Sequence, residues 1–416
     1  MSTMSPVDAS TDSGEDRLPG RRSTFAEGLR LWIANVKAGE IGSIPVFLGL
    51  AAIVIIFQLQ NDKFLSSQNL TNLIVQMSPI VVISTGIVFV LLIGEIDLSV
   101  GVVSGVGGII TARLLIPDGN ELQWWLAFAI AALVALTIGA THGFFVAKLG
   151  VPSLIVTLAT LFIGTGVVLA LAGQRGLIRV QNETVIDIAS TFLSDAIGWT
   201  LATIVVIVYA VEQYLADRAR LSQGLVANSW ASFASKIAMT AAFAFGTVAV
   251  TNADRGLPLV GVIFGVTVVG WLIVVERTRF GRHIYAVGGN AEAARRAGIN
   301  VDRVKIACFM ICSFMAAFGG LILASRLRSV DNSAGGGNLL LNSIAAAVIG
   351  GTSLFGGRGK VTSAIKGALV IAATESGMGL LGWPSDRKFI VTGCILLLAV
   401  TIDTVTRRAR QLSGRA

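Results

Sequence analysis

Charged residues are scarce in this sequence. Of 416 residues, 13% are charged and 54% are hydrophobic, whereas an ordinary soluble domain has about 25% charged residues. The formal net charge is +8, but the basic residues lie between long apolar runs rather than on one soluble face, as nucleic-acid binding would require. The composition therefore excludes an ordinary soluble domain, argues against a nucleic-acid partner and predicts a chain that lies in a lipid bilayer.

Cysteine and histidine are also rare. The cysteines Cys308, Cys312 and Cys394 lie in apolar stretches, which indicates buried fillers rather than a disulfide framework or a metal site. His142 and His283 are isolated from each other and from any serine or cysteine pattern that would form a nucleophile. We therefore expect no catalytic site and no metal or cofactor bound by this chain.

A phosphate-binding loop is missing as well. Such a loop reads G-x-x-x-x-G-K-[ST], and its last hydroxyl holds magnesium. The nearest approach, Gly359-Lys360-Val361, lacks that hydroxyl. Any energy from ATP and magnesium must therefore come from a separate chain.

Long apolar windows dominate the sequence. A spanning helix needs about 20 mostly apolar residues, and this criterion predicts an all-α, polytopic membrane protein of about 12 transmembrane helices, some of them broken. Nine windows are clear: Ile41 to Phe57, Leu98 to Ile116, Trp124 to Val146, Val151 to Ala172, Thr200 to Tyr214, Ile237 to Thr251, Leu257 to Val275, Ile306 to Ala324 and Phe389 to Val405. Three more are mixed: Leu73 to Ile93, which Pro79 interrupts, Leu339 to Ile349, and Ala364 to Leu380.

The placement of lysine and arginine predicts the orientation. If the N-terminus is cytoplasmic, the densest basic segment, Arg277 to Lys305, is cytoplasmic too, and so is the C-terminus. The polar start does not match a signal peptide. We expect a disordered cytoplasmic tail over residues 1–40, a transmembrane domain over 41–405 with a cytoplasmic loop at 276–305, and a cytoplasmic tail over 406–416.

Two carboxylates, Glu95 and Asp97, lie in a glycine-bounded segment, Gly94 to Gly101. Asp97 or Ser99 can accept hydrogen bonds from the amides of the helix expected to begin near Leu98. The alternative is direct contact with a transported solute, since acids within the membrane are often functional. The same spacing, G-x-x-x-L-x-x-G, recurs from Gly350 to Gly357, as in transporters with duplicated halves.

The basic loop contains a short predicted helix. Asn290 suits its N-cap and Gly298 its C-terminal stop. Ala293, Ala294 and Ala297 then share one small apolar face, which would fit a groove on a partner protein. The alternative is a solvated connector that serves only orientation.

These segments resemble a known family. Glu292-Ala293-Ala294 followed by Gly298 resembles the E-A-A-x-x-x-G coupling loop of ATP-binding-cassette importer permeases. Together with Gly94 to Gly101 and the run from Ala347 to Gly359, the chain from about Phe64 to Val405 resembles the monosaccharide permeases of the ribose and xylose type. The resemblance assigns coupling to an ATPase to Glu292, Ala293, Ala294, Arg295, Arg296, Ala297, Gly298 and Ile299.

The resemblance also implies partners and a location. In that family two permease copies form a homodimer, a cytoplasmic ATP-binding subunit docks on the loop, and an extracytoplasmic sugar-binding protein delivers the substrate. We expect a multi-pass protein of the bacterial inner membrane. Glu95, where ribose-type members commonly have Gly, and an additional helix pair near Thr200 to Thr251 are more similar to the xylose-type branch, so we favour a pentose.

Polar residues on apolar helices are the candidates for the sugar path. Each of them could instead form a hydrogen bond with a neighbouring helix. The candidates are Glu95, Asp97, Ser99, Asn72, Gln76, Asn342 and Ser343.

An ion-coupled secondary transporter is the alternative function. Glu95, Asp97, Lys366 and Glu375 would then form a proton or sodium relay. Such a carrier has no use for a docking helix, and a membrane-embedded enzyme would need an acid, a base and a nucleophile that the sequence lacks.

Overall fold

The computed structural model describes residues 22, 24, 27, 44–117, 121–174 and 176–412, which fall into two compact units. One unit contains residues 196–249 together with residues 22, 24 and 27, and the other contains residues 44–195 and 250–412. The predicted tail over residues 1–40 lies outside the described residues, apart from those three.

The elements of each unit are as follows. The smaller unit consists mainly of α8 (Asp195–Ser222) and α9 (Trp230–Asn252). The helices of the larger unit are α2 (Ile44–Gln60), α3 (Ser67–Leu92), α4 (Val100–Leu114), α5 (Trp124–Ala147), α6 (Ser153–Ala172), α7 (Glu183–Ser190), α10 (Leu259–Arg277), α11 (Arg279–Gly289), α12 (Ala291–Arg296), α13 (Val301–Leu327), α14 (Asn338–Ile349), α15 (Ser363–Leu380) and α16 (Ser385–Leu412). Its strands are β1 (Leu177–Arg179), β2 (Phe192–Leu193), β3 (Leu257–Pro258) and β4 (Ser329–Asp331).

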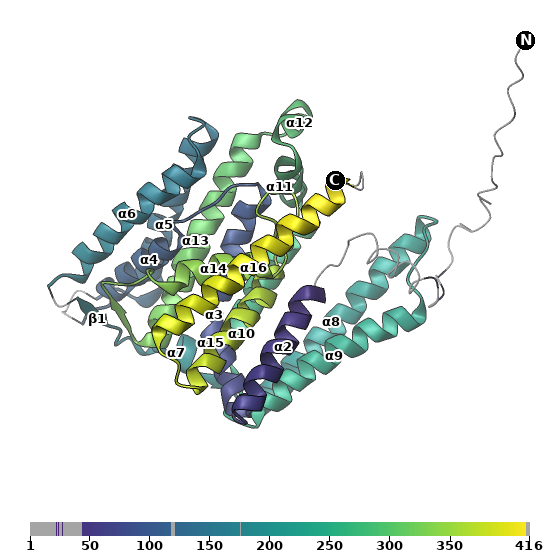
Figure 1. Ribbon diagram of the computed structural model, residues 1–416, viewed down its shortest axis with the longest axis horizontal. Helices are drawn as coiled ribbons and strands as arrows, with labels where there is room; N and C mark the ends of the chain where they lie inside the picture. Colours follow the sequence, from purple (N-terminus) through teal and green to yellow (C-terminus); the bar gives the residue numbers. More distant parts are fainter. Residues whose placement is uncertain are drawn as a thin grey trace, which may run out of the picture. The chain divides into compact units, whose positions relative to one another are not determined.

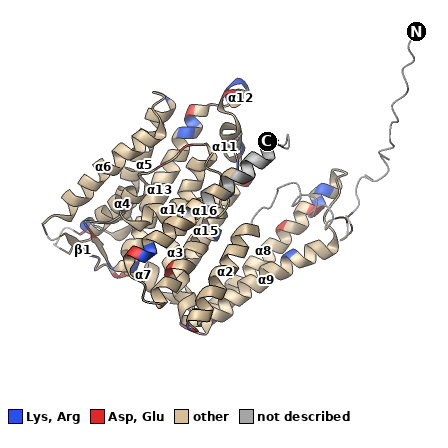
Figure 2. Cartoon of the chain, in the orientation of Figure 1, with Lys and Arg blue, Asp and Glu red and all other residues tan. Residues whose placement is uncertain are grey.

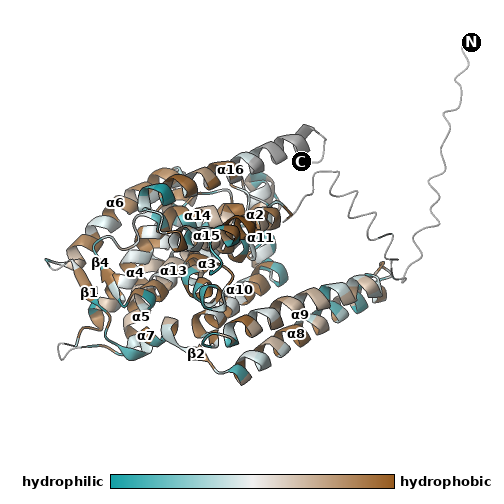
Figure 3. Cartoon of the chain, turned by 60° about the horizontal axis from the view of Figure 1, so that its bottom comes forward, coloured by the Kyte–Doolittle hydropathy of each residue, from teal (hydrophilic) through white to brown (hydrophobic). Residues whose placement is uncertain are grey.

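Each of the twelve apolar windows coincides with a helix. Among the described residues, seven helices are long and apolar enough to cross a membrane, namely α3, α5, α6, α8, α9, α10 and α13. Three more, α2, α4 and α14, are apolar but shorter, and the helices carry the hydrophobic colouring of Figure 3. The all-α, multi-pass architecture is therefore confirmed at this coarser level.

The expected interruption at Pro79 is wrong. Pro79 lies inside α3, which runs without a break from Ser67 to Leu92. Proline lacks the amide that would bond to the preceding turn and normally kinks a helix. Here α3 is buried over most of its length, and α13 lies close enough that a side chain at Gly319 would meet the Pro79 carbonyl and Ile83. Tertiary packing thus outweighs the local preference of proline.

Helix α13 lies at the centre of the larger unit, beside α3, α4 and α5 (Figure 1). Small residues permit this close packing: a Cβ at Gly139 or Gly143 of α5 would overlap the α13 backbone at Phe309, Met310 or Ile306. Helices in lipid associate through such small-residue contacts because apolar burial alone does not drive them together there. The G-x-x-x-G spacing on α5 therefore fixes where α13 lies.

Among the described residues, the larger unit has two short antiparallel strand pairs. Strand β1 pairs with β4, with Ile178 opposite Val330, and β2 pairs with β3, with Leu193 opposite Leu257. Helix α7 is held nearby, because Ser325 at the end of α13 accepts a hydrogen bond from the Ala189 amide (3.0 Å). Figure 1 shows β1 and α7 at the end of this unit opposite to α11 and α12.

Turns rather than a helix join β4 to α14. The backbone at Gly335 packs directly against Gly101 of α4, and a Cβ at Gly105 would overlap Ala334. Irregular backbone at membrane depth is tolerated where protein surrounds it. Helix α14 has 12 residues and is short, as expected for a broken window.

Candidate functional site

Two short helices, α11 and α12, are delimited by capping side chains. Thr278 accepts a hydrogen bond from the Gly281 amide (3.3 Å) at the start of α11, and Asn290 accepts one from the Ala293 amide (2.9 Å) at the start of α12. Gly298 has φ +83°, which a side chain would strain. The predicted cap at Asn290 and the predicted stop at Gly298 are both confirmed.

Helix α12 has one packed side and one exposed side. Ala294 is 4% exposed, and Ala291 and Ile299 pack against the same core. Ala293 and Ala297 are exposed instead, so the three alanines do not share one free face. The remaining predicted coupling residues, Glu292, Arg295, Arg296 and Gly298, are also exposed. The free surface of α12 is thus a mixture of small and charged residues.

Glycines allow α11 to pack directly on two other backbones. A Cβ at Gly288 would overlap Leu92 at the end of α3 and Gly357 in the loop after α14. The Gly357 amide donates a hydrogen bond to the Leu92 carbonyl (2.8 Å). Gly356, with φ +82°, lies against both Gly94 and Gly288. Helix α11, which precedes the Glu292 to Gly298 segment, therefore meets the two glycine-rich segments that carry the family resemblance at one place, which we call the glycine junction.

Tyr285 of α11 forms a further hydrogen bond beside this junction. Its hydroxyl donates a hydrogen bond to the carbonyl of Gly359 (2.8 Å). Burial, followed by the nearby Glu276 carboxylate, raises the pKa of Tyr285. The phenol therefore stays protonated and remains a donor at physiological pH.

Ion pairs link α12 and the glycine junction to the long helices. Asp302 at the start of α13 contacts Lys148 after α5 (2.9 Å) and Arg295 of α12 (3.4 Å). Glu95 pairs with Lys305 of α13. The second pair is better shielded, since the Lys305 and Glu95 side chains are 19% and 16% exposed whereas Lys148 is 52% exposed. Figure 2 shows basic and acidic residues on α12 and on the adjoining end of α13.

The Glu95–Lys305 pair should therefore stabilise the protein more than the Lys148–Asp302 pair. We expect Lys305→Gln to lower the free energy of unfolding by about 2 kcal/mol, because it leaves a shielded carboxylate without its cation. Lys148→Gln should cost less than about 1 kcal/mol, as exposed pairs do. Thermal unfolding in detergent measures both.

Charge exchange provides the stricter comparison. Glu95→Lys should destabilise the protein strongly, and Glu95→Lys combined with Lys305→Glu should recover part of the loss. Equal effects of Lys305→Gln and Lys148→Gln would contradict this ranking.

Asp97 lies just before α4 and is 3% exposed. Its Oδ1 accepts hydrogen bonds from the Ser99 amide (2.8 Å) and the Ser99 hydroxyl (2.6 Å). Helix α4 begins one residue later, at Val100, and Ser99 itself makes no side-chain cap. Asp97 therefore stabilises the turn that leads into α4. It does not accept a hydrogen bond from an amide within α4.

The second oxygen of Asp97 faces a histidine. Oδ2 of Asp97 lies 3.9 Å from Nδ1 of His142 on α5, and both atoms are buried and lack a hydrogen-bond partner within the described residues. Nε2 of His142 lies 2.7 Å from the Thr160 hydroxyl on α6. Sequence reasoning set His142 aside as isolated, because its partners are distant along the chain. The structure instead makes it part of a buried polar group with Asp97 and Ser99.

Asn342 and Ser343 of α14 belong to a different polar group. The Asn342 amide donates a hydrogen bond to Glu375 of α15 (2.6 Å), and the Ser84 hydroxyl of α3 donates one to the Ser343 carbonyl (2.8 Å). Oδ1 of Asn342 and Oγ of Ser343 are buried without a partner within the described residues. Glu375 was not among the predicted sugar-path residues, although it contacts one of them.

Asn72 and Gln76 lie one turn apart on α3 and are only partly buried. Asn72 accepts a hydrogen bond from Arg255, which precedes β3. The predicted path residues thus fall into three groups: Glu95, Asp97 and Ser99 before α4, Asn342 and Ser343 on α14, and Asn72 and Gln76 on α3.

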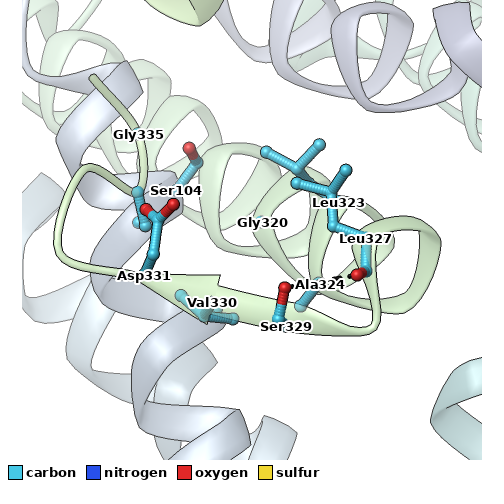
Figure 4. A pocket seen from close by; sticks show the side chains of 12 residues that line it. Ser104, Gly320, Leu323, Ala324, Leu327, Ser329, Val330, Asp331 and Gly335 are labelled. Atoms are coloured by element: carbon cyan, nitrogen blue, oxygen red, sulfur yellow. Dashed lines mark hydrogen bonds between the residues drawn. The ribbon is translucent and has the colours of Figure 1, made fainter. Parts of the chain in front are cut away.

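A small cavity lies between α4, α13 and β4 (Figure 4). Its volume is about 60 Å³ and its lining includes Ser104, Gly320, Ala324, Asp331 and Gly335. Pockets for small organic ligands are usually about 300–1,000 Å³. This cavity could therefore hold water but not a sugar.

Comparisons with known proteins give a consistent result. A family profile described as "Branched-chain amino acid transport system / permease component" matches residues 69–400. The chain is 36% identical over 371 residues (88% of this chain, 93% of the relative) to the "Xylose transport system permease protein XylH" of Escherichia coli (strain K12).

Two further relatives extend the comparison. The protein of the same name from Haemophilus influenzae is 37% identical over 380 residues, covering 90% of this chain and 99% of the relative. The "Ribose import permease protein RbsC" of Escherichia coli (strain K12) is 29% identical over 356 residues, covering 86% and 92%. No solved structure matches the chain significantly.

Proposed function

Because this chain belongs to the family of branched-chain amino acid transport system permease components, we propose that it is the membrane-spanning permease subunit of an ATP-driven sugar importer. The observation that carries the proposal is the exposed surface of α12. Its Arg295 pairs with Asp302 of α13, which also pairs with Lys148 after α5, and the adjoining helix α11 packs on α3 at the glycine junction. A partner that moves α12 would move these helices with it.

The proposed partner is a cytoplasmic ATP-binding subunit. Exposed Ala293 and Ala297 permit close approach of a protein groove, and the neighbouring Glu292, Arg295 and Arg296 offer charged contacts at its rim. Ion pairs and main-chain contacts then connect this surface to α3, α5 and α13. ATP and magnesium would bind to the partner, not to this chain.

The positions of basic residues support a cytoplasmic location for the α12 end. Lys148, Arg295 and Lys305 lie there, close to Asp302 or Glu95. The opposite end is not free of arginine, since Arg179 pairs with Ser329 in its strands, but it has no basic cluster to match the segment from Arg277 to Lys305. An excess of lysine and arginine marks cytoplasmic loops of inner-membrane proteins. We accordingly place both termini in the cytoplasm of a bacterial cell.

A pentose, xylose above all, is the proposed substrate. The relatives named for xylose transport are 36–37% identical to this chain, and those named for ribose import are 29–30% identical. Glu95 and the α8–α9 pair, features expected of the xylose-type branch, agree with this ranking. An extracytoplasmic binding protein would select the sugar before it reaches the membrane.

The sugar would pass by alternating access along a path between two copies of the chain. Asn342 and Glu375 are the best candidates for contact with sugar hydroxyls, because a carboxylate and an amide offer both donors and acceptors. In the alternative, an ion-coupled transporter, Glu95, Asp97 and Glu375 would bind ions. In this structure each already has a partner, respectively Lys305, Ser99 and Asn342.

Bulky substitutions on the free side of α12 test the proposal. We expect Ala293→Trp and Ala297→Trp to reduce co-purification with the ATP-binding subunit at least tenfold and to abolish ATP-dependent xylose uptake into proteoliposomes, while the melting temperature changes little. Gln181→Trp, at an exposed position of the opposite end, is the matched control and should retain both. Xylose accumulation driven by a cation gradient, with this chain as the sole protein, would refute the proposal.

A further inference from the structure

A buried carboxylate lies where α8 connects to α9. The Asp217 side chain is 2% exposed, and its Oδ1 accepts hydrogen bonds from the Asn228 side-chain amide (2.8 Å) and more weakly from the Asn228 main-chain amide (3.4 Å). A buried carboxylate is costly unless a cation or further donors satisfy it. We therefore expect a cation beside the other oxygen of Asp217, Oδ2.

Arg22 provides that cation. Its Nη1 lies 3.5 Å from Oδ2 of Asp217 and donates a hydrogen bond to the carbonyl of Asn228 (3.2 Å). The guanidinium carbon lies 3.6 Å from the centre of the Trp230 ring. The backbone of Arg22 also forms a parallel bridge with Ala227. Four kinds of contact thus converge on one residue from a distant part of the sequence.

We propose that the α8–α9 connection is a binding site for a guanidinium group and that its occupant is Arg22, so that this helix pair holds the chain at Arg22. Guanidinium is the cation that fits best. Its plane stacks on an aromatic ring while its edge donates to a carboxylate and a carbonyl, whereas an ammonium group is more strongly hydrated and has no flat face.

The site gives α8 and α9, the additional helix pair of this chain, a role outside the sugar path. It also fixes topology, because Arg22 must lie on the same side of the membrane as Asp217 and Trp230 in order to touch them. The neighbouring Arg218 and Arg220 are on the same helix as Asp217. The site nevertheless takes its arginine from the N-terminal segment. This inference stands independently of the proposed transport function.

Distance measurement between two spin labels tests the docking. The labels are placed at Ser23→Cys, next to Arg22, and at Gln223→Cys, on the exposed end of the α8–α9 connection, in a full-length chain whose native cysteines have been replaced. We expect one narrow distance distribution. Arg22→Ala, Arg22→Lys, Asp217→Asn and Trp230→Ala should each lower the ratio of docked to released segment about tenfold or more.

Two comparisons make the result decisive. Arg22→Ala leaves every residue of α8 and α9 unchanged, so it tests the docking without changing the sequence of the helix pair. Arg21→Ala removes the neighbouring arginine and should keep the narrow distribution. A narrow distribution that persists in Arg22→Ala, or an equal loss in Arg21→Ala, would overturn the proposal.

Discussion

Replacing Gly288 with alanine is expected to destabilise the protein by about 3 kcal/mol and to abolish transport. The added Cβ would overlap the Leu92 carbonyl and the Gly357 amide, which themselves form a hydrogen bond. Overpacking usually costs about 1–3 kcal/mol, and the upper end applies because main-chain atoms cannot rotate away as a side chain can. Thermal unfolding and ATP-dependent xylose uptake measure the two effects.

The adjacent residue provides a matched control. A Cβ at Gly289 would meet no other atom within 4 Å, so Gly289→Ala should keep transport and leave stability unchanged or slightly higher, since alanine favours a helix by about 0.5–1 kcal/mol. If the two substitutions behave alike, the glycine junction does not transmit movement from α12 to α3.

Removing His142 should have the second largest effect. His142→Ala removes the imidazole that faces the buried Asp97 carboxylate, and it also removes the contact with Thr160. Leaving a buried polar group unsatisfied costs about 1–3 kcal/mol, and removing the side chain adds the cost of the cavity that it leaves. We expect a loss of this order in the free energy of unfolding, with a corresponding fall in the amount of folded protein recovered from membranes.

A second substitution can show whether His142→Ala lowers stability through the lost contact with Asp97 or only through the lost side-chain volume. Asp97→Asn removes the charge but keeps an oxygen for Ser99, so adding it to His142→Ala should restore part of the stability. The other histidine, His283, is only half-buried, and His283→Ala should change stability by about 0.5 kcal/mol or less. If the double variant is less stable than His142→Ala alone, the contact with Asp97 is not what His142 provides.

Much of the fold could be predicted from apolar windows. Every window that was recognised is a helix, because about 20 apolar residues have few alternatives in lipid. The number of spans could not be predicted in the same way: α4 and α14 have 15 and 12 residues, fewer than the about 20 that a spanning helix needs. The predicted break at Pro79 was wrong because the effect of proline on α3 depends on packing against α13, which the sequence does not show.

The candidate site was predictable only where its residues are neighbours in sequence. The caps Asn290 and Gly298 follow from local rules. The partners of Asp97, Glu95 and Asn342 do not, because His142, Lys305 and Glu375 lie tens to hundreds of residues away along the chain. Composition marks such residues as costly in a membrane but cannot say which of them meet.

The central position of α13 has a consequence for biosynthesis. Helices α3, α4 and α5 leave the ribosome well over a hundred residues before α13, yet their closest neighbour is α13. Until it is made, the small-residue faces at Gly86, Gly107 and Gly139 have no helix to pack on. Assembly of the larger unit is therefore a late event, and a nascent chain that stops before Val301 must rely on lipid, insertase or chaperone to protect those faces.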